Sequence, residues 1–142
     1  MPTLLDLARQ MISGEVPPPP VARLVGFKLE SIEPGIAVVS LEADERRHAN
    51  PMGTLHGGIL CDITDAAMGL AFASTLQDDE SFTTLELKIS FLRAVRNGRL
   101  VASGRVLHRG RNIGFVESDV VDETGALIAR ATSTCLRLAA KS

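Results

Sequence analysis

The sequence predicts an α+β fold in which an antiparallel sheet of six strands curls around one buried helix. Two observations support this prediction. From residue 26 onward, most segments alternate apolar and polar residues with the period of two that strands show, and turn residues separate them. A single segment, Gly57 to Ser74, is apolar nearly all round, which is typical of a helix covered on every side. The chain of 142 residues is long enough for one domain with its own core.

The expected strands follow one another between recognisable turns. They span residues 26–33, 36–43, 83–92, 100–107, 113–121 and 126–138. Pro34-Gly35 is a pair that a type II turn prefers, and Asn97-Gly98 predicts a tight hairpin into the strand of residues 100–107. In the third strand, one face should carry Leu85, Leu87, Ile89 and Phe91, and the opposite face should carry Thr84, Glu86 and Lys88.

The first 25 residues differ from the rest of the chain. Residues 4–12 form a short amphipathic pattern that predicts a helix, and four prolines follow at residues 17–20. Because consecutive prolines fit neither a helix interior nor a central strand, they separate this helix from the main body. We therefore expect a lead-in over residues 1–25 and a domain over residues 26–138. The lead-in helix either caps the functional site or packs elsewhere.

Composition and spacing argue against several classes of protein. The chain has five phenylalanines, no tyrosine or tryptophan and no basic run, so nucleic-acid binding is not expected. Its longest apolar stretch, residues 59–73, contains two aspartates and is too short to span a membrane. Cys61 and Cys135 lie in apolar periodic segments rather than in a disulfide framework, and the histidines show no metal-ligand spacing with them. With no signal peptide pattern, a cytoplasmic protein is expected.

Two acidic residues interrupt the apolar helix. Asp62 and Asp65 are three residues apart and therefore share one face. An ionised carboxylate without a partner is costly to bury, so each needs an explanation. Asp62 lies in the first turns, where the helix dipole stabilises negative charge. Asp65 lies deeper, and it is either a solvated group at a dimer seam or a functional carboxylate. A second copy of the chain is the simplest cover for the side of the helix that one sheet leaves open.

The loop before the helix ends in Gly57-Gly58. Two glycines at a helix start leave backbone N–H groups open to a ligand, and the positive end of the helix dipole favours an oxyanion or a polarised carbonyl there. A tight loop that needs positive φ would also explain the glycines. His56 and Asn50 have equally simple structural explanations, as a capping histidine and a turn asparagine.

The stretch from Asn50 to Ala67, NPMGTLHGGILCDITDAA, resembles the signature of hotdog-fold acyl-CoA thioesterases. The most similar branch is the PaaI-like one, typified by the phenylacetate-degradation thioesterase. The similarity continues through TTLELKISFLRAV at residues 83–95 and covers about residues 26–138. It implies the hotdog fold, in which a six-stranded sheet wraps one helix and the subunits form dimers.

The resemblance also implies roles for individual residues. Asp65 takes the position of the catalytic carboxylate, which acts as nucleophile or general base in different members of the family. Gly57 matches the glycine whose N–H group polarises the thioester carbonyl. His56 and Asn50 match residues that orient the carbonyl or the attacking water, and Thr84 matches an assisting hydroxyl.

Substrate contacts are expected at three further positions. Gly58 adjoins the polarising glycine, and Arg111 and Asn112 lie in a turn that resembles the stretch along the pantetheine arm. An exposed, solubilising turn explains Arg111 and Asn112 equally well. The acyl pocket should draw on apolar side chains such as Met52, Met68, Phe72 and Phe82. No cofactor is implied, because coenzyme A is part of the substrate.

Helix geometry makes this site intersubunit. Gly57 and Asp65 are eight residues apart, or about 12 Å along the axis, whereas catalytic contacts to one carbonyl are around 3 Å. Two antiparallel helices across a dimer would place Asp65 of one beside Gly57 of the other. We therefore expect a homodimer, further paired into a dimer of dimers. The alternatives are a non-catalytic acyl-CoA-binding module and, less in keeping with these motifs, a hotdog hydratase or dehydratase.

Overall fold

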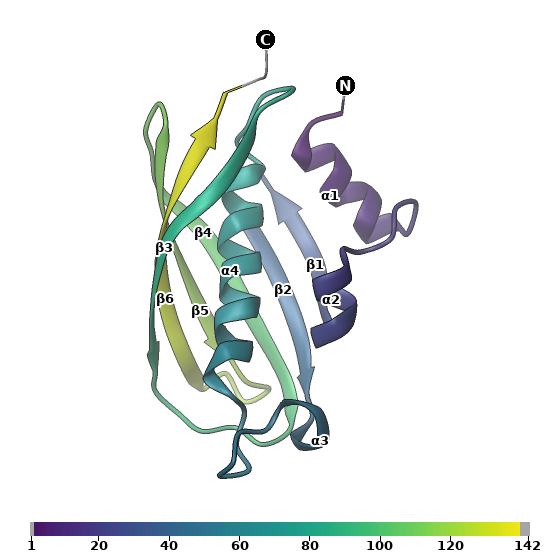
Figure 1. The fold of residues 1–142 in the computed structure, drawn as a ribbon, viewed down its shortest axis with the longest axis vertical. Coiled ribbons are helices and arrows are strands. Elements are labelled where there is room, and N and C mark those ends of the chain that lie inside the picture. Colours follow the sequence, from purple (N-terminus) through teal and green to yellow (C-terminus); the bar gives the residue numbers. More distant parts are fainter. Residues whose placement is uncertain (1, 140–142) are drawn as a thin grey trace.

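A computed structural model describes residues 2–139 (Figure 1). Its helices are α1 (Leu4–Ser13), α2 (Pro20–Val25), α3 (Glu45–His48) and α4 (Gly57–Ala73). Its strands are β1 (Phe27–Glu33), β2 (Ile36–Ala43), β3 (Ser81–Phe91), β4 (Gly98–Arg109), β5 (Ile113–Val121) and β6 (Leu127–Leu138). They form one antiparallel sheet in the order β1-β2-β4-β5-β6-β3, which curls around α4. The predicted fold class is confirmed.

Two glycines of the sheet allow α4 to lie close against it. A Cβ atom added to Gly104 in β4 would be 2.3 Å from the carbonyl oxygen of Ala67, and one added to Gly114 in β5 would be 2.3 Å from the Phe72 ring. Ala67 and Phe72 are both fully buried. The sequence therefore places residues without side chains where the helix backbone and its largest side chain meet the sheet.

The predicted hairpin at Asn97-Gly98 is wrong. β3 pairs only with β6 at the edge of the sheet, whereas β4 lies between β2 and β5. The segment between β3 and β4 is therefore a crossover, held by a bond from the Leu55 N–H group to the Val95 carbonyl at 2.7 Å and one from Leu92 to Ile128 at 2.9 Å. Gly98 does have a positive φ of 116°, but the turn leads from the crossover into β4.

The period of two in β3 is broken by a β-bulge. Thr84 pairs with Cys135 and Glu86 with Thr134, so Leu85 has no partner in β6 and its side chain is 54% exposed. The bulge shifts the alternation by one residue, since an extra residue in one strand exchanges the faces beyond it. Thr84 therefore lies on the same side as Leu87 and Ile89, and its predicted place on the opposite face is wrong.

The lead-in folds back onto the domain. α1 begins at a capping box, in which Thr3 and Asp6 exchange hydrogen bonds, and it ends at Gly14 in the left-handed conformation. Its Ala8 is buried against β1 and α4. α2 has Pro20 in its first turn, where a missing N–H group costs nothing. Across the described residues, no helix has the length and hydropathy needed to cross a membrane.

Candidate active site

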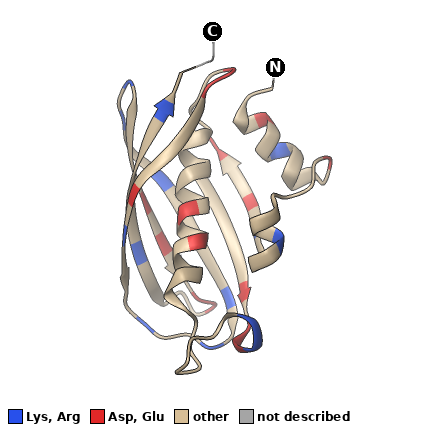
Figure 2. Cartoon of the chain, in the orientation of Figure 1, with Lys and Arg blue, Asp and Glu red and all other residues tan. Residues whose placement is uncertain are grey.

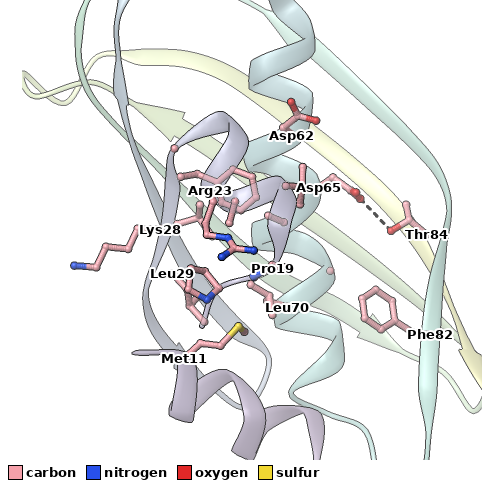
Figure 3. Close-up of a pocket in the computed structure, with 18 residues that line it drawn as sticks. Met11, Pro19, Arg23, Lys28, Leu29, Asp62, Asp65, Leu70, Phe82 and Thr84 are labelled. Atoms are coloured by element: carbon pink, nitrogen blue, oxygen red, sulfur yellow. Dashed lines mark hydrogen bonds between the residues drawn. The ribbon is translucent and has the colours of Figure 1, made fainter. Parts of the chain in front are cut away.

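α4 carries its two charges on one face, and one of them contacts β3. Figure 2 shows two acidic positions on an otherwise uncharged helix, and these are Asp62 and Asp65. The Thr84 hydroxyl donates a hydrogen bond of 3.0 Å to Oδ1 of Asp65 (Figure 3). The bulge in β3 makes this contact possible, because it turns Thr84 toward the helix. The contact leaves the second oxygen of the Asp65 carboxylate available to a substrate or a water molecule.

Asp62 lies one turn before Asp65 and is half-buried, whereas Asp65 is exposed. Burial raises the pKa of Asp62, and the negative charge of Asp65 raises it further.

A cavity of about 610 Å³ opens beside these carboxylates. The lead-in, β1, β2, α4 and β3 contribute its lining residues, namely Met11, Pro18, Pro19, Val21, Ala22, Arg23, Gly26, Phe27, Lys28, Leu29, Val39, Asp62, Asp65, Ala66, Gly69, Leu70, Phe82 and Thr84. Most of these residues are apolar. The cavity therefore joins a carboxylate–hydroxyl pair to a largely hydrophobic space.

The start of α4 faces a second, smaller cavity of about 380 Å³, lined by Asn50, Gly57 and Phe91 among others. Within residues 2–139, the Gly57 N–H group donates to no acceptor, whereas the Gly58 N–H group donates to Nδ1 of His56 at 2.9 Å. A Cβ atom on Gly57 would be 2.8 Å from the Phe91 ring. Among the described residues, the Gly57 N–H group thus has no acceptor and lies in this smaller cavity. A side chain at position 57 would fill the space beside it.

His56 and Asn50 hold the loop before α4. As the N-cap, His56 uses Nδ1 as an acceptor, which assigns the proton of the neutral ring to Nε2. Oδ1 of Asn50 accepts from the N–H groups of Met52 and Thr54, at 3.0 and 3.1 Å, and Nδ2 donates to the Thr54 hydroxyl at 2.9 Å. Asn50 therefore fixes the loop that leads to Gly57.

The predicted site residues fall into two groups within one protomer. Asp65 and Thr84 line the larger cavity, and Asn50 and Gly57 line the smaller one. Along the α4 axis, Asp65 lies about 12 Å beyond Gly57. One chain thus carries both halves of the predicted constellation but does not bring them together.

Arg111 and Asn112 line neither cavity. They lie in the turn between β4 and β5, at the end of the sheet opposite the start of α4 (Figure 1). Oδ1 of Asn112 accepts a hydrogen bond from Arg137 at 2.9 Å, and Arg137 also pairs with Glu80. The Arg111 carbonyl accepts from Arg137, while the Arg111 side chain is exposed.

Among the four side chains expected in the acyl pocket, only Phe82 lines the larger cavity. Met68 and Phe72 are fully buried between α4 and the sheet, and Met52 is 71% exposed in the loop before α4. Of the two places expected for the lead-in, over the functional site or elsewhere, the structure has it beside the larger cavity, which residues from Met11 to Arg23 line. Its only signal in the sequence is the amphipathic pattern of residues 4–12.

Known proteins resemble this chain over most of its length. The 1,4-dihydroxy-2-naphthoyl-CoA hydrolase of Listeria monocytogenes is 32% identical over 104 residues, which is 73% of this chain and 84% of the hydrolase. Human acyl-coenzyme A thioesterase 13 is 26% identical over 137 residues, 94% of this chain and 96% of that enzyme. The crystal structure of a phenylacetic acid degradation-related protein from Ralstonia eutropha has a TM-score of 0.82 at 33% identity, and the match covers 91% of this chain and 98% of that one.

These similarities agree with the hotdog arrangement of the sheet and α4. Residues 52–129, more than half of the chain, match the thioesterase superfamily, and this segment contains Gly57, Asp65 and Thr84. The chain therefore belongs to the thioesterase superfamily and is a thioester hydrolase of the PaaI-like kind.

Proposed function

We propose that this protein hydrolyses acyl-CoA thioesters at sites shared between two protomers. One protomer supplies Asp65 and Thr84, and the other supplies the N–H group of Gly57. The observation that carries the proposal is the division of these residues between two cavities of one chain. A second, antiparallel α4 would bring the two halves together. The coenzyme A substrates named for the relatives from Listeria and human support the choice of thioester.

The free edge of the sheet offers the surface for pairing. β3 is an 11-residue edge strand that pairs with β6 on one side only. Such an edge has unpaired backbone groups that a second copy can satisfy. Leu85, Phe91 and Leu92 along it are each more than half exposed. We place the dimer contact here, and a contact between dimers on the outer sheet face around Leu107 and Phe115, which are 48% and 41% exposed.

In this arrangement the thioester carbonyl oxygen accepts a hydrogen bond from the Gly57 N–H group. The N-terminus of α4 adds its positive potential where negative charge develops. His56, with its proton on Nε2, is a second donor for orienting the carbonyl. Asp65 takes a proton from water, whose oxygen attacks the carbonyl carbon; alternatively, Asp65 attacks directly and water hydrolyses the resulting anhydride. In either route the C–S bond breaks and coenzyme A leaves as a thiolate that accepts a proton.

Arg111 and Asn112 complete the proposal as contacts for the coenzyme A arm. The exposed Arg111 guanidinium is a donor for phosphate oxygens, and Arg137 holds the neighbouring Asn112 in place. We also propose a cytoplasmic location, where both free cysteines would stay reduced.

Complementation between two inactive variants tests the shared site. Asp65→Asn removes the carboxylate. Gly57→Pro removes the N–H group; the first turn of a helix accepts the proline backbone, but the ring would also displace the neighbouring Phe91 side chain. Each variant alone should fail to release free thiol from acyl-CoAs. After mixing under conditions that exchange subunits, half of the dimers are mixed and each has one intact site, so about a quarter of the wild-type activity should return.

The two variants should first be shown to exchange subunits, for example by mass spectrometry of differently labelled chains. Exchange without any recovery of activity would contradict the shared site. Tight binding of acyl-CoAs by the wild type without turnover would favour a binding module over an enzyme.

A further inference from the structure

We propose that the lead-in, residues 4–25, forms one wall of the acyl-binding site, and that Met11 lies where the end of the acyl chain is held. The inference rests on the proposed function and adds a substrate class to it. Extended aliphatic acyl groups of medium or greater length should be preferred over a single aromatic ring.

The face of α4 that lines the larger cavity changes from acidic to apolar along the helix. Its lining residues are Asp62, Asp65, Ala66, Gly69 and Leu70. Their spacing of three, one, three and one residues puts them in a single stripe, which covers about 12 Å of the helix axis. The carboxylates lie at one end, the two small residues follow, and the leucine comes last. A chain whose carbonyl lies beside Asp65 can therefore run along an apolar groove toward Leu70.

Gly69 lets the Phe82 ring pack directly against α4 in this groove. A Cβ atom at this position would be 3.2 Å from Cζ of Phe82, so a side chain here would push the ring away. The Phe82 ring is fixed in turn by Phe72, with 5.8 Å between the ring centroids. Gly69, Phe82 and Phe72 thus form a close-packed floor between α4 and β3, and a methylene chain would lie over this floor.

The wall facing the α4 stripe belongs to the lead-in. Met11, Pro18, Pro19 and Val21 line the cavity from this side. Figure 3 shows Met11 and Asp62 at opposite ends of the lining residues, with Leu70 between them and Phe82 to one side on β3. The lining cations, Arg23 and Lys28, are exposed, which places them at the mouth of the cavity.

This wall is anchored at both ends. α1 is fixed by its buried Ala8, which is 1% exposed. At the end of α2, the Val25 carbonyl accepts from Nε2 of the buried His48 at 2.8 Å, and the Leu24 carbonyl accepts from Arg47 at 3.2 Å. The Nδ1 atom of His48 accepts from the Asp44 N–H group, which requires the proton on Nε2. The lead-in is therefore held in place as a fixed wall of the cavity.

The size of the cavity indicates a long substrate. Its volume of about 610 Å³ lies within the usual range for ligand sites, roughly 300–1,000 Å³. A single aromatic ring beside Asp65 would leave most of it empty, whereas an aliphatic chain could fill it. Burial of one methylene group contributes about 0.8 kcal/mol. We therefore expect kcat/KM to rise about fourfold for each methylene group added, until the chain reaches Met11.

The test is a chain-length profile of kcat/KM with butanoyl-, hexanoyl-, octanoyl-, dodecanoyl- and palmitoyl-CoA, together with benzoyl-CoA. Met11→Trp should fill the far end of the cavity and lower the ratio of dodecanoyl to hexanoyl kcat/KM at least tenfold. Ile12→Trp is the matched control, because Ile12 is the next residue of α1, is 39% exposed and does not line the cavity. Its ratio should equal that of the wild type.

Equal ratios in the two variants, or a wild type that prefers benzoyl-CoA, would overturn the inference. A binding measurement separates this result from a failure of the proposed function. If no acyl-CoA is hydrolysed, calorimetry with dodecanoate still examines the cavity: weaker binding by Met11→Trp than by Ile12→Trp would support the acyl wall while the hydrolase proposal fails. Equal binding by both variants would reject the wall as well.

Discussion

The Asp65 carboxylate on α4 has its hydrogen-bond partner on another element, the strand β3. The Thr84 hydroxyl fixes one carboxylate oxygen, and the contact depends on the bulge that leaves Leu85 unpaired. This hydrogen bond orients the Asp65 carboxylate. Thr84 therefore acts through the carboxylate as a positioning residue.

Replacing Thr84 tests this role. Thr84→Val keeps the shape of the side chain and removes the donor, so kcat should fall about tenfold, the factor that a hydrogen bond of about 1.4 kcal/mol represents. Thr84→Ser should restore most of the loss. Steady-state kinetics with one acyl-CoA would measure both variants, and KM should change less than kcat. A Val variant with wild-type kcat would show that the bond plays no part in turnover.

Asp62 should make the free energy of unfolding depend on pH. Since burial raises its pKa, the native state holds the proton more tightly than the unfolded state. Ionising Asp62 therefore costs stability as pH rises above the unfolded pKa of 3.8. Asp62→Asn should increase Tm at pH 7, and this gain should shrink toward pH 4. Thermal unfolding between pH 4 and 8 would measure it.

Asp119 provides the opposite case for the same experiment. Its hydrogen bond to Arg130 lowers the pKa of Asp119, so the stability it contributes is present above the unfolded pKa and is lost as pH falls. Asp119→Asn should therefore lower Tm at pH 7, with a difference that also shrinks on acidification. A loss of stability in Asp62→Asn at pH 7 would contradict the argument from burial.

At the scale of elements, the contact between α4 and the sheet depends on glycines. Gly104→Ala would place a methyl group 2.3 Å from the Ala67 carbonyl oxygen and 2.8 Å from the Met68 nitrogen, which are backbone atoms that cannot rotate away. The helix must shift, so we expect a loss of about 1–3 kcal/mol in the free energy of unfolding. Urea denaturation would measure it. Ser103→Ala, on the exposed neighbouring residue, is the control, and equal stability of the two variants would exclude close packing here.

The elements themselves were largely predictable from local pattern. The buried helix was expected at residues 57–74 and spans Gly57–Ala73, and the six strands lie within two residues of their predicted bounds at every end. Periodicity and turn residues are local signals, and they suffice for this. The pairing of β3 with β6 was not predictable from them. Asn97-Gly98 indicates a turn but not which strands it joins, and a bulge at Leu85 leaves the alternation of the sequence unchanged.

The candidate site was predictable only in part. The motif around Gly57 and Asp65 identified the candidate site residues. The rise of the helix between the two was enough to predict that they lie about 12 Å apart in one chain. The cavity was not predictable, because its walls come from segments far apart in the sequence. Met68 and Phe72 look like pocket residues in the sequence, but they face the sheet and are buried. The short helices α2 and α3 have too few residues for a periodic signal.

At the scale of the whole molecule, activity should depend on association. The protomer of 15.2 kDa has an unpaired edge at β3 and carries its site residues in two separate cavities. Sedimentation should give a mass of two or four protomers, and specific activity should fall on dilution as protomers dissociate. Leu85→Asp, which introduces charge along the exposed edge, should move this fall to higher concentration. A fully active species with the mass of one protomer would contradict the shared site.

The position of the lead-in along the chain has an evolutionary consequence. The segment that matches the superfamily begins at residue 52, well after the helices that close the larger cavity. Mutations among the first 25 residues can therefore reshape that wall while Gly57, Asp65 and Thr84 stay unchanged. Selection can act on the choice of acyl group and on the chemistry of hydrolysis through separate stretches of the gene.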